Sequence, residues 1–172
     1  MRVVLINAVC GTGSTGHIVA DIWKTLKDQG HEVKVAYGVG EGHIVAPEDR
    51  ICFNNKVGYY AHNLLAKITD KTGEYSRHQT KKLIRRIEEF NPEVIHLHNL
   101  HGYYINYPIL FDYLAKKNVP VIWTLHDCWA YTGHCTHFSY VNCSKWMNLC
   151  SNCPQKREYP KSYVIDQSRN NY

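Results

Sequence analysis

The chain has 172 residues, 44% of them hydrophobic and 20% charged, with 20 basic and 15 acidic residues giving a net charge of +5. This composition excludes a disordered, collagen-like or coiled-coil protein and predicts one folded domain. No apolar run approaches the roughly 18 residues that a membrane span needs, and the apolar start is too short for a signal peptide. We therefore expect a cytoplasmic protein and, without a basic–aromatic recognition motif, no nucleic-acid partner.

Short apolar runs alternate with amphipathic patterns along the first 125 residues. Strands are predicted over residues 2–7, 33–37, 94–98 and 121–125, with helices around 18–26, 59–68, 83–90 and 109–117. This alternation is typical of a doubly wound parallel sheet, which predicts a Rossmann-like α/β core over residues 1–125. Residues 126–172 lack an apolar period, and we expect them to form a Cys-rich loop region and tail of the same domain.

A glycine-rich turn joins the first strand to the first helix. Gly11, Gly13 and Gly16 have the spacing of a dinucleotide-binding turn, whose backbone N–H groups approach a phosphate. A nicotinamide enzyme also needs an acidic residue near the end of the second strand, and the sequence has none there. The turn predicts phosphate or acceptor binding rather than NAD binding, and a plain tight turn is the alternative.

Histidines cluster where the third and fourth predicted strands end. His96 and His98 alternate along one strand and so lie on the same side of it, and His101 follows. His126 stands beside Asp127 after the next strand, and such a pair can bind a hydroxyl or move a proton. Ligands bind at this edge of open α/β sheets, which predicts a substrate site. Core packing and helix capping are the alternatives.

Five of the seven cysteines lie in the last third of the chain. Four of them could hold one structural zinc ion: Cys135, Cys143, Cys150 and Cys153. His134 and His137 could replace a thiolate. A metal would order a loop that has little apolar content of its own. Disulfides and free thiols are the alternatives to zinc.

Residues 56–68 mix aromatic, apolar and basic side chains. A helix of this kind could lie in a membrane interface, which predicts peripheral contact with the inner face of the cytoplasmic membrane. The alternative is a helix that packs on the sheet with a polar outer face.

Several motifs follow one another in a specific order along the whole chain: Gly13–Gly16, His96–Tyr104, Trp123–Trp129, Gly133–Cys135, Cys143–Trp146 and Cys150–Lys156. In this order the sequence resembles the N-terminal domain of family 4 glycosyltransferases, in the branch associated with capsule and colanic-acid-type exopolysaccharides. The resemblance implies a GT-B architecture, in which two Rossmann-like domains face a cleft. It also implies a retaining enzyme that uses a nucleotide sugar and needs no catalytic metal.

The resemblance places the turn beside the donor phosphates and His126 near the transferred sugar. We predict His126 as the catalytic residue, and as substrate-binding residues Gly13, Ser14, Thr15, Gly16, His98, Asn99, His101 and Asp127. The family's donor domain is absent from these 172 residues. We therefore expect an acceptor-side domain that binds the nucleotide sugar weakly, is inactive alone, and serves a glycan or lipid-linked acceptor. A non-catalytic, zinc-stapled binding module is the alternative.

Overall fold

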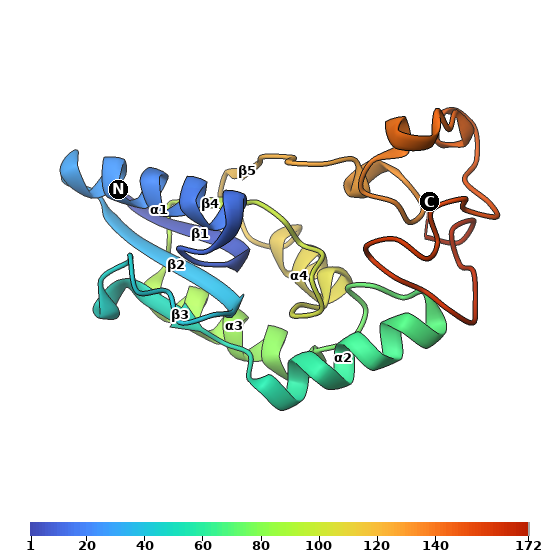
Figure 1. Cartoon of the computed structure of the whole chain (residues 1–172). Helices are drawn as coiled ribbons and strands as arrows, with labels where there is room; N and C mark the ends of the chain where they lie inside the picture. Colours follow the sequence, from blue (N-terminus) through green and yellow to red (C-terminus); the bar gives the residue numbers. More distant parts are fainter. Residues whose placement is uncertain (172) are drawn as a thin grey trace.

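A five-stranded parallel sheet lies between two layers of helices in the computed structural model, which describes residues 1–171 (Figure 1). The strands are β1 (Arg2–Val9), β2 (Glu32–Val39), β3 (Arg50–Cys52), β4 (Val94–Leu97) and β5 (Val121–Trp123). They follow the order β3-β2-β1-β4-β5, and every neighbouring pair is parallel. This order confirms the predicted Rossmann-like α/β fold.

The sheet has one strand more than the sequence pattern predicts. β3 pairs with residues 35–37 of β2 and buries Ile51 at the edge of the core. Ile51 is its single buried side chain, so residues 50–52 show neither an apolar run nor the alternation by which strands are predicted. The count of four strands is therefore wrong, and the sheet extends by one strand on the β2 side.

The helices cover opposite faces of the sheet: α1 (Gly13–Asp28), α2 (Lys56–Thr69), α3 (Arg77–Phe90) and α4 (Tyr107–Leu114). α1 packs Val19 and Ala20 against Leu5 and Val35 on one face. Leu83 of α3 and Leu110 and Leu114 of α4 pack on the other face. Figure 1 shows α3 below the sheet. α4 begins before the predicted 109–117 because Asn106 caps it by accepting a hydrogen bond from the Ile109 N–H, at 3.0 Å.

Beyond β5 the chain makes only short 3₁₀ turns among residues 124–171: η2 (Trp129–Tyr131), η3 (Phe138–Val141) and η4 (Lys145–Met147). The region is held to α2 through its backbone, since the Tyr163 and Ile165 N–H groups donate to the Lys67 and Ile68 carbonyls at 2.7 and 3.0 Å. Residues 124–171 contain no α-helix and no strand. Within residues 1–171, no helix is long and apolar enough to cross a membrane.

Candidate functional site

The carboxyl edge of the sheet gathers the end of β1, the glycine turn and the segments that follow β4 and β5. Asn7 of β1 is fully buried and joins two of them. Its side-chain amide donates to the Val9 carbonyl at 2.8 Å and to Thr15 Oγ1 at 3.4 Å, while its oxygen accepts from the Asn99 N–H at 3.2 Å. Asn7 thus fixes the turn relative to the end of β4, a role that its place inside an apolar run does not reveal.

Two histidines from neighbouring strands meet at this edge. His98 is fully buried, and its Nδ1 lies 2.9 Å from Nε2 of His126. The His96 ring lies beside it on the same side, as predicted, with 4.2 Å between the ring centroids. Burial and the nearby His96 and His126 rings lower the pKa of His98 to about 3. His98 is therefore neutral at physiological pH and offers His126 a fixed hydrogen-bond partner.

A second pair, between His101 and Asp127, lies next to the first. His101 Nε2 is 2.6 Å from Asp127 Oδ2, and its Nδ1 is 3.0 Å from the Tyr159 hydroxyl. The other carboxylate oxygen accepts from the Trp129 N–H at 2.9 Å. Burial would raise the pKa of Asp127, but the hydrogen bonds from His101 and Trp129 outweigh it and hold that pKa below its usual range. An ionised carboxylate is thus built into this edge.

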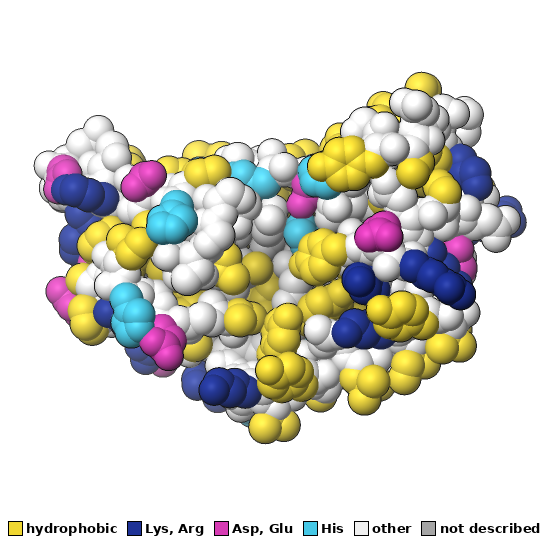
Figure 2. All heavy atoms as spheres, viewed as in Figure 1, with side chains coloured by type: hydrophobic (Ala, Val, Ile, Leu, Met, Phe, Trp, Pro, Cys, Tyr) yellow, Lys and Arg dark blue, Asp and Glu magenta, His cyan; other side chains and the backbone are white. Residues whose placement is uncertain are grey.

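Both pairs line one small hollow of about 10 Å³, which also contains Asn99. That volume holds about one water molecule, so the hollow is the floor of a site rather than an enclosed pocket. Figure 2 shows histidines gathered where the surface sinks between the sheet and the Cys-rich region. The structure therefore brings five predicted site residues together: His98, Asn99, His101, His126 and Asp127.

The glycine turn is adjacent but does not line this hollow. Gly11 has φ +65° and its N–H donates to the Gly16 carbonyl at 3.1 Å, which closes the turn at the start of α1. Gly13, Ser14 and Thr15 form the first turn of this helix, which the Asn7 hydrogen bonds tie to the site. The predicted residues of the turn thus share one edge with the histidines without contacting them directly.

Comparison with known proteins decides the family. The family described as Glycosyltransferase Family 4 matches this sequence over residues 15–153, which is most of the chain. The chain belongs to glycosyltransferase family 4. Over 171 aligned residues it is 26% identical to the colanic acid biosynthesis glycosyl transferase WcaC of Escherichia coli K12. The alignment covers 93% of this chain but 41% of WcaC, so the family 4 chain spans less than half the length of that relative.

The four predicted zinc ligands of this family 4 chain surround one cavity of about 10 Å³, together with Phe138 and Trp146. They are Cys135, Cys143, Cys150 and Cys153, and all four are free thiols. No three His, Cys, Asp or Glu side chains in residues 1–171 are arranged to ligate one ion, so the structure does not support the zinc site. A hydrogen bond between the thiols of Cys135 and Cys153 lowers the pKa of Cys135 to about 6 and raises that of Cys153.

His134, the predicted substitute ligand, belongs to no such group of three within residues 1–171, and its Nδ1 lies 2.5 Å from the carboxylate of Asp70. The two side chains are 64 positions apart in the sequence, and both are buried. The spacing of cysteines and histidines along the loop could not reveal this pair. It is the principal polar contact of the region that sequence reasoning missed.

Proposed function

We propose that the chain is the acceptor-side domain of a retaining glycosyltransferase, with His126 as the residue that contacts the transferred sugar. Membership of family 4 supports sugar transfer as the reaction class. The observation that carries the assignment of the site is the meeting of His98 with His126, beside His101 and Asp127, at the carboxyl edge of the sheet. Ligands of open α/β sheets bind at this edge.

The geometry suggests a division of labour between the two pairs. His98 engages Nε2 of His126 and so fixes the plane of that ring, which leaves the other nitrogen of His126 for a substrate hydroxyl. Asp127 orients His101 through a short hydrogen bond and places one negative charge near a sugar. A hydrogen bond that strengthens as the glycosidic bond breaks would accelerate transfer rather than merely tighten binding.

A second domain would complete the site. The hollow at His126 holds about one water molecule and cannot enclose a nucleotide sugar. We propose that residues 1–125 and 126–172 together form one wall of a GT-B cleft, and that the opposite wall holds the donor nucleotide. The first turn of α1, with Gly13, Ser14, Thr15 and Gly16, would face the donor phosphates. One wall cannot hold both reactants together, so the chain alone would not transfer sugar.

The acceptor class follows from the relative. WcaC is named for colanic acid biosynthesis, and we propose a polysaccharide or lipid-linked glycan as the acceptor here. Growing glycans of this kind are bulky, so an open edge such as the one at His126 would suit them better than an enclosed pocket. Work on a lipid-linked glycan would bring the chain to the cytoplasmic face of a membrane.

The outer surface of α2 supports such membrane contact. Rather than a polar outer face, it exposes apolar side chains at helical spacing, and residues 163–164 lie beside them: Val57, Tyr60, Leu64, Ile68, Tyr163 and Val164. Figure 2 shows this apolar stripe along the lower edge, over α2, with Lys and Arg side chains next to it. Apolar insertion rimmed by Lys56, Lys67 and Lys161 matches an anionic lipid surface, which we propose as the partner.

Zinc remains a separate proposal for the Cys-rich region, and catalysis does not depend on it. Four thiols line one cavity, and thiolates are the ligands that structural Zn(II) prefers. The hydrogen bond between Cys135 and Cys153 would have to be replaced by bonds to the ion. The ion would then tie the loop together without contributing to sugar transfer.

The decisive experiment assays the complete enzyme encoded by the reading frame that contains this chain. Nucleoside diphosphate release from a panel of nucleotide sugars, with membrane extract as the acceptor source, should show transfer. The 172 residues alone should show none. Turnover by the isolated chain, or a reading frame without a second α/β domain, would contradict the proposal and favour a binding module.

A further inference from the structure

A cavity of about 180 Å³ lies between the end of α2, α4 and the start of the Cys-rich region. Tyr107, Phe111, Trp123 and Trp129 supply aromatic walls. Polar groups from other segments complete the lining: Asp70, Thr72, Thr132, His134 and Asn171. Aromatic rings and hydrogen-bonding groups therefore line the same cavity.

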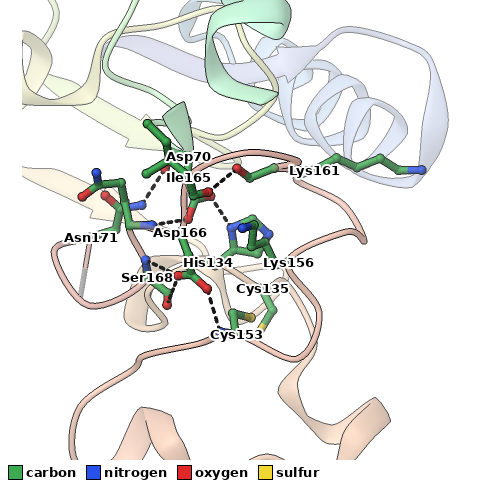
Figure 3. A network of polar contacts seen from close by, with 12 residues as sticks. Asp70, His134, Cys135, Cys153, Lys156, Lys161, Ile165, Asp166, Ser168 and Asn171 are labelled. Atoms are coloured by element: carbon green, nitrogen blue, oxygen red, sulfur yellow. Dashed lines mark hydrogen bonds and ion pairs between the residues drawn. The ribbon is translucent and has the colours of Figure 1, made fainter. Parts of the chain in front are cut away.

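The polar side of the cavity is organised by Asp70, which follows the last residue of α2. Its Oδ1 contacts His134 Nδ1, and its Oδ2 accepts from the Gln167 N–H at 2.8 Å. The backbone carbonyl of Asp70 accepts from the Asn171 amide at 2.7 Å. Figure 3 shows His134 and the segment 165–171 converging on Asp70. Asp70 is thus fixed by contacts from two distant parts of the chain.

His134 has one nitrogen without a partner. Because a carboxylate accepts, Nδ1 donates to Asp70, which leaves Nε2 as the other polar atom of the ring. Nε2 is buried and makes no hydrogen bond within residues 1–171. A buried polar atom left unpaired is costly, so a ligand hydroxyl that forms a hydrogen bond with Nε2 would be favoured.

The aromatic side is also fixed in place. The rings of Tyr107 and Trp129 meet edge to face with 5.7 Å between centroids, and Phe111 lies 5.5 Å from Trp123. Gly73 allows this arrangement, because a Cβ there would lie 2.6 Å from the Tyr107 ring. Rings held in this way can receive a flat, weakly polar face without rearranging.

A pyranose ring combines an apolar C–H face with hydroxyl groups at its edge. We propose that this cavity binds a single sugar ring, stacked on the aromatic wall, with one hydroxyl forming a hydrogen bond with Nε2 of His134. This inference rests on the proposed function, because the sugar would belong to the glycan acceptor. The cavity adjoins the hollow at His126, since both are lined by Trp123, Trp129 and Ala130.

Size and charge limit the ligand. Pockets that enclose drug-sized ligands measure about 300–1,000 Å³. The 180 Å³ available here suits one ring and not a nucleotide. The described lining contains an acidic side chain, Asp70, and no Lys or Arg, which disfavours a phosphate. The site therefore fits a neutral sugar unit rather than the donor.

The test uses the full 172-residue chain and needs no sugar transfer. The chain has four tryptophans, so a ¹H–¹⁵N spectrum resolves four indole N–H signals. Titration with methyl glucoside or methyl galactoside should shift the signals of Trp123 and Trp129, which line the cavity. Trp23 in α1 and Trp146 in the Cys-rich region serve as internal controls and should not move.

Three variants separate recognition from folding. H134N keeps an amide donor for Asp70 but lacks Nε2, and it should bind the glycoside about tenfold more weakly at an unchanged melting temperature. H134Q keeps a polar group near the Nε2 position but loses Asp70, so it should be less stable and retain more of the binding. A130L, which narrows the cavity while keeping His134 and Asp70, should abolish binding.

Absence of indole shifts in the wild-type chain, or equal affinity in folded A130L, would overturn the sugar site. Shifts that include Trp23 and Trp146 equally would show nonspecific binding and have the same consequence. No donor or turnover is involved, and His134 does not line the hollow at His126, so weaker binding in H134N assigns the sugar to this cavity and not to the hollow. If the complete enzyme transferred no sugar but the chain still bound the glycoside, the proposed reaction would be contradicted and the sugar site in the cavity would stand.

Discussion

The rings of His98 and His126 are stacked, with centroids 5.2 Å apart and planes inclined by 18°. His98 directly follows β4 and His126 follows β5, so the pair joins the carboxyl ends of two adjacent strands. The backbone reinforces it, since the Trp123 indole donates to the His98 carbonyl at 2.9 Å. The ring of His126 is therefore held in one orientation by a neutral, buried partner, as a substrate-binding group requires.

His126→Ala in the complete enzyme should lower kcat about 10²–10³-fold, by analogy with the loss of one donor that stabilises a transition state. The melting temperature should change little, because His126 is only half-buried. Turnover and thermal unfolding are measured on the same preparation. His78→Ala, at an exposed position of α3, is the matched control. A destabilised variant with normal turnover would assign His126 to the core instead.

Acid should destabilise the chain well above the range where carboxylates titrate. Burial lowers the pKa of His98 to about 3 and that of His62 to about 4. Both folded-state pKa values lie below the unfolded value of about 6.5. Above that pH both histidines are neutral whether the chain is folded or unfolded. As the pH falls, the unfolded chain binds protons first, which lowers the free energy of unfolding. Each histidine should cost about 2 kcal/mol of unfolding free energy between pH 7 and pH 5.

Denaturant unfolding at both pH values measures this loss. His62→Gln should remove about half of this loss, because it removes one of the two buried histidines. Gln can still accept the hydrogen bond from the Gly73 N–H that His62 accepts at 3.2 Å, so the variant should fold. The exposed His78→Gln should leave the pH dependence unchanged. Equal stability of the wild-type chain at the two pH values would refute the prediction.

Membrane binding should depend on the apolar stripe of α2. Leu64 is 61% exposed, and Leu64→Glu places a charge where apolar insertion is proposed. Co-sedimentation with vesicles containing anionic lipid should fall at least several-fold in this variant. Met147→Glu is the control, since Met147 is equally exposed at 61% but lies in η4. If binding of the wild-type chain to vesicles did not depend on anionic lipid, the proposed membrane contact would be contradicted.

Metal content decides between the interpretations of the Cys-rich region. If zinc is bound, elemental analysis of protein purified without added metal should give about one equivalent, and chelation should lower the melting temperature. Cys150→Ser should lose the metal, whereas Cys52→Ser, at an exposed position in β3, should keep it. Less than a tenth of an equivalent, with all thiols titrating freely, would contradict the zinc proposal.

The sequence by itself determined the fold class and the local chemistry of this protein. Buried strands and amphipathic helices leave patterns that span a few residues, and parallel strands then place His98 and His126 at one edge. It also indicated the irregular region after β5, because that region lacks any apolar period. β3 was not predicted because it buries a single side chain, Ile51, and so shows no run of apolar residues.

Only the tertiary structure decided which polar groups meet. Asn7 and Asn99 are 92 positions apart, and Asp70 and His134 are 64 apart. Such contacts depend on strand register and on how an irregular segment returns to α2, and neither leaves a local signal in the sequence. For the same reason, four cysteines could be expected to meet, whereas the hydrogen bond within one pair could not. Burial of a polar group is decided by packing, and packing is a property of the whole fold.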